Sequence, residues 1–428
     1  MTGFVAAVAV GLSGCGSSGS GTQTQTQTPA FTLSVPSTTV SVVQGGSGSS
    51  TVTTAVSGGF DAAIALTASE VPAGVTVSFS PVSIAAPGTG TSTVTINVAS
   101  TAVTGNYIFL VTGTGQGQTQ KGEISLTITS VAAPRLVGYL PDYDGSYATF
   151  ATTLDFNKMT HLDIAFGVPP ACNGACTASS DMTWTLSSGL QSDAEIAALV
   201  NAAHTAGVKV MLSIGGGSNS TDDLISAFYN AGLSTQLAAS LDSYLTAHNL
   251  DGVDVDIEDP SNMGANYEAF VSALIAKLHP EGKIVSAAVA EWLQTQNVMS
   301  NSTLQSFDFV NVMVYSNLAD CKTAIEYFAG LGEPNNQMTI AVPFFGQNAD
   351  GTIAETYATI LAAYPDAWQS DEVSGGSLDG GATLYYVGEA TMAQETQLGI
   401  QYGGISIWEL SQDAAPPHSL LNVIQNNL

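Results

Sequence analysis

Between residues 31 and 129, apolar and polar residues alternate in short runs that are bounded by turn residues such as Gly45-Gly46 and Pro87-Gly88. Alternation with a period of two is typical of β-strands that bury one face. The runs lie at residues 31–35, 39–43, 50–56, 63–68, 74–80, 92–99, 106–113 and 122–129. Strands at this spacing predict an all-β sandwich, which we place at residues 31–130.

After a short break at residues 131–134, apolar strands alternate with helical segments. The strand candidates are residues 135–140, 161–167, 208–214, 252–258, 283–290, 309–315, 338–344 and 404–408. Eight strands with helices between them predict a (β/α)8 barrel over residues 134–428. A doubly wound open sheet is the alternative, but its first turn would more often be rich in glycine. A helix is predicted at residues 193–206, because Ser192 and Glu195 form a capping-box pattern and Gly207 follows.

The first thirty residues show no periodic pattern of apolar residues that would predict a folded core. Residues 4–12 form an apolar run of signal-peptide length, too short to span a bilayer as a helix. The run leads into Leu12-Ser13-Gly14-Cys15, which resembles the box of bacterial lipoproteins, although no Lys or Arg precedes it. The resemblance implies a signal segment at residues 1–15, lipidation of Cys15 and attachment to a membrane surface outside the cell. Residues 16–30 are polar and of low complexity, as in a flexible linker.

The charge of the chain is strongly unbalanced. It has 7 Lys and Arg against 35 Asp and Glu, a formal net charge of -28. Only three of the acids and one of the bases precede Pro134, so the second domain holds 32 acids and 6 bases. This charge argues against nucleic acid and anionic lipid as partners and favours a neutral polymer. We expect an extracellular or cell-surface protein that tolerates acidic or saline surroundings, and a monomer.

The four cysteines are Cys15, Cys172, Cys176 and Cys321. They include no Cys-x-x-Cys pair and have no histidine cluster near them, so we expect neither a metal site nor another cofactor. Cys172 and Cys176 could close a small loop by a disulfide in an oxidising compartment, which would leave Cys321 unpaired.

Residues 251–260 contain closely spaced acidic residues and are the strongest candidate for a catalytic site. Three β-branched residues alternate with three acids, in the order Val253, Asp254, Val255, Asp256, Ile257 and Glu258. The alternation predicts a strand with one apolar face and one carboxylate face. Enclosed carboxylates at this spacing repel one another and cannot all stay ionised. We therefore predict that crowding raises the pKa of Glu258, which holds a proton for a leaving group. The alternative is an acidic edge strand that discourages aggregation.

The acids Asp251, Asp254, Asp256 and Glu258 have the spacing D-x-x-D-x-D-x-E, which resembles the signature of glycoside hydrolase family 18, the chitinases. The resemblance implies hydrolysis of β-1,4-linked N-acetylglucosamine polymers with Glu258 as the acid and base. Asp256 is implied to hold the acetamido group of the sugar, Asp254 to stabilise Asp256, and Asp251 to shape the turn into the strand. Carboxyls at i and i+2 point the same way, so they cannot stand on opposite sides of one bond.

Other predicted strands carry residues that resemble motifs of the same family. Ser213 opens a Ser-Ile-Gly-Gly run like the S-x-G-G motif, and Tyr139 is implied to reach the buried acids. Met313 and Tyr315 belong to a run like M-x-Y-D, in which the tyrosine positions the acetamido carbonyl. Trp408 is implied to form the floor under the reacting sugar. Taken singly, Tyr139 and Tyr315 could be core aromatics and Trp408 could simply close the barrel.

The sequence also departs from the family pattern. Ser316 replaces the Asp that usually follows the tyrosine, and the seventh strand has Phe where Tyr is frequent, in Pro343-Phe344-Phe345-Gly346. These changes concern substrate preference or pH range. Between the seventh and eighth strands we expect helices but no extra α+β insertion, and therefore a shallow, open groove. Glu291 and Trp292 could line a further sugar subsite.

Alternatives to a chitinase stay open. An endo-β-N-acetylglucosaminidase acting on N-glycans can share the same motif. A chitin-binding lectin on an inactive barrel is disfavoured because Glu258, which lectin relatives usually lose, is present. In the first domain, residues 72–81 resemble the Ig-like modules of secreted bacterial proteins. A spacer is favoured there over a carbohydrate-binding module, since the segment contains no Trp.

Overall fold

The computed structural model describes residues 27–130, 133–169, 178–217, 219–291, 299–376 and 378–428. The chain forms two compact units, Met1–Val131 and Ala132–Leu428. Several predictions lie outside the described residues: the signal segment, Cys15, most of the linker, the Cys172–Cys176 pair and Trp292. No helix in the described part of the chain is long and apolar enough to cross a membrane.

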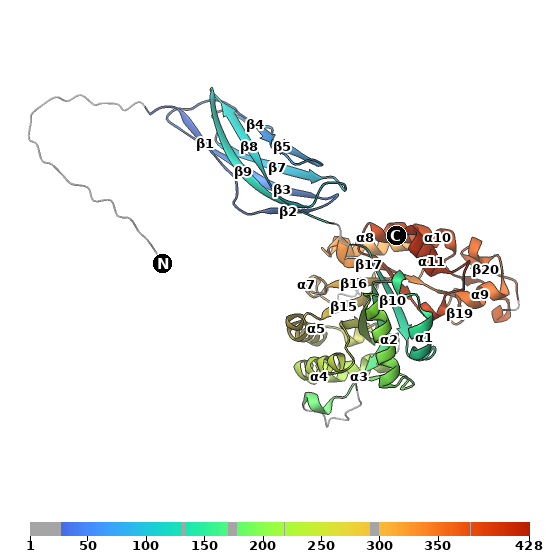
Figure 1. The fold of residues 1–428 in the computed structure, drawn as a ribbon. Coiled ribbons are helices and arrows are strands. Elements are labelled where there is room, and N and C mark those ends of the chain that lie inside the picture. Colours follow the sequence, from blue (N-terminus) through green and yellow to red (C-terminus); the bar gives the residue numbers. More distant parts are fainter. Residues whose placement is uncertain (1–26, 131–132, 170–177, 218, 292–298, 377) are drawn as a thin grey trace, which may run out of the picture. The chain divides into compact units, whose positions relative to one another are not determined.

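The described part of the first unit is built of β-strands in two sheets (Figure 1). The strands are β1 (Ala30–Ser34), β2 (Val40–Val43), β3 (Ser47–Ser57), β4 (Ile64–Ser69), β5 (Val75–Ser80), β6 (Ser83–Ile84), β7 (Gly90–Val98), β8 (Gly105–Gly115) and β9 (Gln118–Thr129). One sheet has the order β1-β3-β7-β5 and the other β2-β9-β8-β4-β6. Alternate residues of both sheets, such as Val94 and Ile96 of β7 and Phe109 of β8, form one buried cluster. Each predicted run coincides with a strand, whereas β6 has only two residues and gave no pattern.

The second unit contains eight parallel strands that close into a barrel (Figure 1). They are β10 (Arg135–Pro141), β11 (His161–Val168), β13 (Lys209–Gly215), β14 (Gly252–Asp256), β15 (Ile284–Val289), β16 (Phe309–Met313), β17 (Met338–Pro343) and β22 (Gly404–Trp408). Each pairs with the next, β10 pairs with β22, and the two-residue β12 (Thr185–Leu186) is added to β11. The predicted (β/α)8 barrel is confirmed.

Helices follow most of the barrel strands. They are α1 (Tyr147–Thr153), α2 (Asp193–Thr205), α3 (Asn219–Asn230), α4 (Ser234–Ala247), α5 (Ala265–Leu278), α7 (Asn301–Leu304), α8 (Leu318–Gly330), α9 (Tyr357–Ala363), α10 (Glu389–Ile400) and α11 (Leu420–Asn427). Ser192 caps α2 by accepting a hydrogen bond from the Glu195 N–H, and the Glu195 carboxylate accepts one from the Ser192 N–H. Gly207, with a φ of +80°, lies just beyond the helix. The predicted capping box is therefore confirmed.

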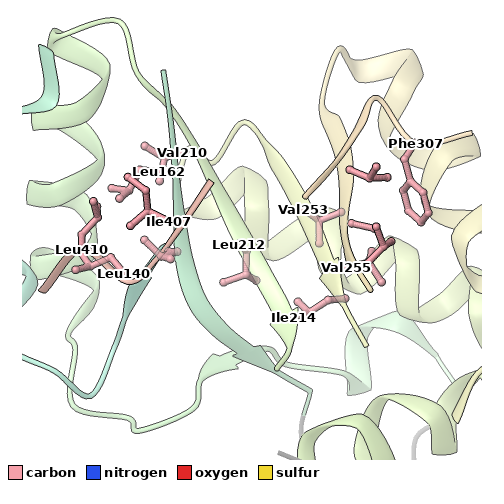
Figure 2. Close-up of a cluster of buried hydrophobic side chains, with 14 of the residues drawn as sticks. Leu140, Leu162, Val210, Leu212, Ile214, Val253, Val255, Phe307, Ile407 and Leu410 are labelled. Carbon is pink, nitrogen blue, oxygen red and sulfur yellow. The ribbon is translucent and has the colours of Figure 1, made fainter. Parts of the chain in front are cut away.

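The alternation of each strand divides the barrel into two environments. Outward-facing residues such as Val253, Val255 and Leu212 pack in the main hydrophobic cluster (Figure 2). Inside the barrel, Val137, Tyr139, Met211 and Phe309 form a separate small apolar cluster. Asp254 is also fully buried, and it lies on the opposite face of β14 from the two valines. The interior is therefore partly polar, and this polar part carries the chemistry described below.

The segment between β17 and β22 differs from the prediction. It contains a four-stranded antiparallel sheet with the order β19-β18-β21-β20, together with α9. The strands are β18 (Phe345–Gln347), β19 (Ala354–Thr356), β20 (Glu372–Val373) and β21 (Leu384–Tyr385). The expectation that no α+β insertion is present was wrong. Strands of two or three residues are too short to show a period-two pattern, so they could not be predicted from the alternation of residues.

Candidate active site

Strand β14 carries its acids into the interior of the barrel. Asp254 and Asp256 lie on the strand and are 0% and 4% exposed, while Glu258 lies two residues beyond its end and is half-buried. The strand was predicted to continue to Glu258 but ends at Asp256. The acids thus step from the barrel core towards the carboxyl ends of the strands, where the active sites of such barrels lie.

Asp254 is held by hydrogen bonds from four other strands. Its Oδ2 accepts the Tyr139 hydroxyl at 2.9 Å and the Ser213 hydroxyl at 3.0 Å. Its Oδ1 accepts the Ser286 hydroxyl at 2.7 Å and the Asn311 amide at 3.4 Å. Burial raises the pKa of Asp254, and these hydrogen bonds act in the opposite direction. The structure brings the predicted Tyr139 and Ser213 to the predicted Asp254, which fixes this carboxyl in one orientation.

Asp256 is the least satisfied acid of the array. Its Oδ1 is buried and has no hydrogen-bond partner in the described part of the chain. Burial, and then the nearby Glu258 and Asp254 carboxyls, raise the pKa of Asp256 well above its usual value. An acid in this environment is protonated or awaits a donor from a bound molecule. The free oxygen marks a place where a ligand N–H group would be accepted.

Burial raises the pKa of Glu258. The direction is the one expected from the sequence, but the cause differs, since enclosure outweighs crowding by the other acids. The side chain stands against Gly217, where an added Cβ would come within 3.4 Å of Glu258 Oε1. The absence of a side chain at Gly217 leaves that room free beside the carboxyl. Glu258 is therefore a half-buried acid that keeps its proton to higher pH than a free glutamic acid.

Tyr315 lies just beyond β16, which ends at Met313, two residues earlier than predicted. Tyr315 has a φ of +43°, and its ring contacts Phe345 edge-on at 5.7 Å between centroids. Burial, and then the Asp256, Glu258 and Asp254 carboxyls, raise the pKa of its hydroxyl well above the usual value. The hydroxyl therefore stays a hydrogen-bond donor beside the acids. Met313 is half-buried at the end of its strand, where it pairs with Ala341 of β17.

Trp408, the last residue of β22, is half-buried among aromatic rings. It stacks on Phe166 at 5.6 Å with an interplanar angle of 21°, and its centroid is 5.7 Å from that of Tyr139. Tyr139 in turn donates to Asp254. The tryptophan therefore packs against Tyr139, one of the residues that hold the deep acid.

The insertion between β17 and β22 adds a side cavity next to Tyr315. The cavity has a volume of about 290 Å³, and Phe345, Gln347, Asp371 and Tyr385 contribute to its lining. Ser316 also lines it and donates a hydrogen bond to Asp320 at 2.6 Å. The site therefore has a wall on this side, contrary to the open groove that the sequence suggested.

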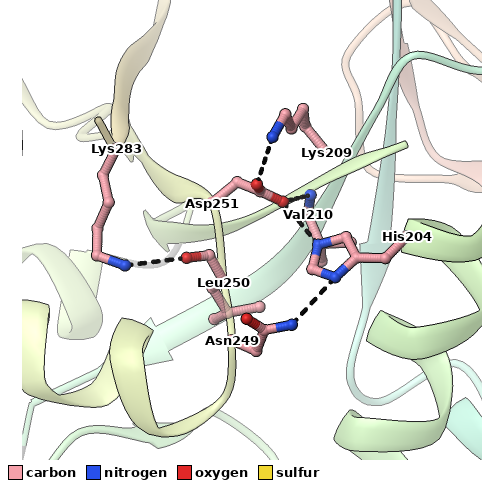
Figure 3. A network of polar contacts seen from close by, with 7 residues as sticks. All are labelled: His204, Lys209, Val210, Asn249, Leu250, Asp251 and Lys283. Atoms are coloured by element: carbon pink, nitrogen blue, oxygen red, sulfur yellow. Dashed lines mark hydrogen bonds and ion pairs between the residues drawn. The ribbon is translucent and has the colours of Figure 1, made fainter. Parts of the chain in front are cut away.

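Asp251 lies at the opposite end of the strand from Glu258. It accepts hydrogen bonds from Lys209 Nζ and His204 Nε2, both at 2.7 Å, and from the Val210 N–H at 2.9 Å (Figure 3). Burial would raise the pKa of Asp251, but these three donors hold it below its usual value. Of the predicted site residues, Asp251 is the one that the structure separates from the others. It supports the fold at the amino end of β14.

Several polar residues of the site were not predicted. Ser286 and Asn311 follow the inward parity of their strands, and this parity could have revealed them. Asp163 on β11 is fully buried, and neither of its carboxylate oxygens has a hydrogen-bond partner among the described residues. Asp163 could have been predicted as a site residue, because it is a single acid within an otherwise apolar strand. Asp222 on α3 has no such signal, because a helix position does not reveal that its side chain reaches a strand end.

No group of three or more His, Cys, Asp or Glu residues with metal-binding geometry occurs within the described ranges. Cys321, in α8, is buried and carries no disulfide.

The fold is a (β/α)8 barrel whose fourth strand carries buried carboxyls towards its carboxyl end, where the active sites of such barrels lie. Residues 135–413 match the family described as glycosyl hydrolases family 18. The chain belongs to this family, and it is a glycoside hydrolase.

Solved structures and curated proteins agree with this assignment. The chitinase ChiB of Flavobacterium johnsoniae is 27% identical, with a TM-score of 0.58 over 69% of this chain and 94% of that chain. The family 18 chitinase of Cycas revoluta in complex with (GlcNAc)3 shares the fold, at 19% identity and a TM-score of 0.56 over 68% of this chain and 99% of that chain. A chitinase-like effector of Moniliophthora perniciosa is 36% identical over 111 residues, 26% of this chain and 23% of that protein. The chain thus matches less than a quarter of that curated relative.

Proposed function

We propose that the barrel hydrolyses β-1,4-linked N-acetylglucosamine polymers, chitin and its oligosaccharides, with Glu258 as acid and base. The observation that carries the proposal is the array of Asp254 and Asp256 on β14 with Glu258 two residues beyond its end, where Glu258 is half-buried and burial raises its pKa. Family membership and the similarity to the F. johnsoniae chitinase support the substrate class.

The geometry favours a nucleophile that belongs to the substrate. Most glycosidases place two carboxyls on either side of the bond, about 5–5.5 Å apart for retention. Asp256 and Glu258 are two residues apart on consecutive inward positions, so they approach the sugar from the same side. In the substrate-assisted mechanism, the 2-acetamido carbonyl oxygen takes the place of the second carboxylate.

The proposed reaction has two steps. Glu258 donates its proton to the glycosidic oxygen, the bond from that oxygen to C1 breaks, and the acetamido oxygen bonds to C1. Asp256 accepts the acetamido N–H and balances the positive charge of the oxazolinium intermediate, while Tyr315 donates to the acetamido oxygen. Water then attacks C1, and the ionised Glu258 takes a proton from this water. The bond from the acetamido oxygen to C1 breaks, so the oxazolinium ring opens to the acetamide and the configuration at C1 is retained.

The surrounding residues prepare this chemistry. Four donors, Tyr139, Ser213, Ser286 and Asn311, fix the Asp254 carboxyl in one orientation beneath Asp256. Trp408 offers a flat face for the apolar side of the sugar. Because these groups are already in place, little reorganisation accompanies the charge that develops at C1.

The test compares the parent protein with Glu258→Gln on chitin oligosaccharides. Gln keeps the size and polarity of the side chain but cannot donate the proton, so we expect hydrolysis to fall by at least about a hundredfold while binding persists. The parent should release β-anomers first, as read by NMR. Efficient cleavage of plain cellulose would refute the assisted mechanism, because that sugar has no acetamido group.

The same assay separates the alternatives. The similarity to a chitinase-like effector raises a binding-only role, and a parent protein that binds the oligomers without cleaving them would support it. Release of N-glycans from a high-mannose glycopeptide, with chitin oligosaccharides left intact, would instead indicate an endo-β-N-acetylglucosaminidase.

We further propose that Cys15 carries a lipid that holds the protein at a membrane surface outside the cell, with residues 16–30 as a linker and the first unit as an Ig-like spacer. The resemblance of Leu12–Cys15 to a lipoprotein box supports this arrangement. Incorporation of labelled fatty acid in the expressing cells, compared between the parent and Cys15→Ser, tests it, and equal labelling of the two would disprove lipidation at this residue.

A further inference from the structure

Asp222 approaches the candidate acid from a different element. It lies in the first turn of α3, the helix after β13, and is 1% exposed. Its Oδ2 accepts the backbone N–H groups of Glu258 and Asp259, both at 3.0 Å. One carboxylate oxygen therefore fixes two consecutive peptide groups at the point where the chain leaves β14.

The second oxygen of Asp222 is also buried, and it has no hydrogen-bond partner in the described ranges. It lies against Gly215, where an added Cβ would come within 3.0 Å of it and where φ is +111°. Burying a charge with one oxygen unsatisfied costs more than burying a neutral acceptor, which could hold the same two N–H groups. A purely structural role does not account for a carboxyl here.

We propose that Asp222 is a positioning residue for Glu258, which fixes the backbone that bears the acid and places a second ionisable carboxyl beneath it. This inference rests on the proposed role of Glu258 as acid and base. Asp256 is proposed to contact the substrate, whereas Asp222 is bonded to the backbone of Glu258 and Asp259, so its effect passes through Glu258.

Among the residues that the structure describes, no cation is found to act on Asp222. The titratable groups that face it are Asp256, Glu258 and Asp259 from β14 and the turn after it, Tyr229 from α3 and Tyr267 from α5. Burial raises the pKa of Asp222 to about 7, although the two backbone N–H groups favour its charged form. Asp222 therefore titrates near neutral pH, and the Glu258 carboxyl contributes to this raised pKa. Because two ionised carboxyls repel each other, the charge of either acid favours the protonated form of the other.

Two substitutions separate the charge from the hydrogen bonds. Asp222→Asn keeps an acceptor oxygen but removes the charge, so the alkaline limb of the pH–rate profile should move to lower pH by about half a unit or more. Asp222→Ala also removes both accepted hydrogen bonds, so kcat should fall by about tenfold with a smaller change in KM. The matched control is Asp223→Asn on the next, exposed position, which makes the same change of charge away from Glu258.

The experiment records the pH–rate profiles of the full chain and the three variants on a chitin oligosaccharide. A shift of the alkaline limb in Asp222→Asn, absent in Asp223→Asn, supports the inference. Superimposed profiles for the parent and Asp222→Asn, or equal shifts in both Asn variants, would overturn it.

An independent readout does not require turnover. The protein is labelled with 13C at the glutamate side-chain carboxyl, and the Glu258 signal is identified by its loss in Glu258→Gln. Its titration should move to lower pH in Asp222→Asn, and an unchanged titration would again overturn the inference. If the parent cleaves no oligosaccharide, the proposed function fails, while this titration still decides whether Asp222 acts on Glu258.

Discussion

Tyr315 shows at the level of one residue how the site is prepared. A φ of +43° is rare for a tyrosine, because the left-handed region costs roughly 1–2 kcal/mol for residues with a Cβ. The ring is held against Phe345, the first residue of the inserted sheet. Strained backbone of this kind clusters at functional sites. The strain turns the tyrosine out of the strand alternation and leaves its hydroxyl beside the acids.

Replacing Tyr315 by Phe should reduce kcat on chitin oligosaccharides by about tenfold to a hundredfold, because the donor to the developing charge on the acetamido group is lost. KM should change less, since the ring remains. Initial rates measure both constants. The control is Tyr402→Phe just before β22, at the opposite end of the barrel, and equal losses in the two variants would contradict the proposed role.

The acids on β14 could be predicted from the sequence because alternation places them on one face, and the structure brings Tyr139 and Ser213 to them as expected. Asp222 could not be predicted, because its contact with Glu258 depends on how α3 packs against the strand end. The raised pKa of Glu258 was predicted in its direction but assigned to crowding rather than burial. The alternation of residues in the sequence shows which side chains share a face of the strand, but it does not show how deeply the fold buries them.

At the scale of elements, the predicted bounds of long strands and capped helices lie close to the bounds in the structure. The bounds of β22 agree with the predicted segment and α2 ends one residue early, whereas β14 and β16 end two residues early. The inserted sheet was missed because its strands are too short to show alternation. Local pattern therefore predicts the barrel frame well, while the wall beside Tyr315 is formed by tertiary contacts.

The capping of α2 gives a prediction at the same scale. Ser192→Ala removes the side-chain acceptor for the Glu195 N–H and should lower the free energy of unfolding by about 1 kcal/mol. Urea denaturation measures the change. Ser192→Thr, which keeps the hydroxyl, should recover most of the loss, and an unchanged midpoint in Ser192→Ala would show that the cap contributes no stability.

For the whole molecule, the scarcity of bases leaves buried carboxyls without cationic partners. Burial raises the pKa of Glu333 and Glu409 to about 7 and that of Glu395 to about 8. Burial also raises the pKa of Asp163 well above its usual value. In the unfolded chain these groups titrate near pH 4. Their contribution to stability is therefore complete below about pH 4 and is lost as the pH rises to about 8.

We expect the urea midpoint of the parent to be higher at about pH 5 than at about pH 8. Asp163→Asn, which cannot ionise, should show a smaller decrease between the two values. The exposed Asp223→Asn is the control and should follow the parent. A midpoint that rises towards alkaline pH would contradict this account and the expected tolerance of acidic surroundings.

The two ends of β14 are anchored by one neighbouring stretch of chain. His204, Lys209 and Val210 hold Asp251 at its start, and Asp222 holds the peptide groups after its end. Residues 204–259 therefore behave as one inherited module in any recombination of related barrels. A chimera joined before α2 or after Asp259 would receive the acid together with its supports, whereas a junction between β13 and β14 would separate them.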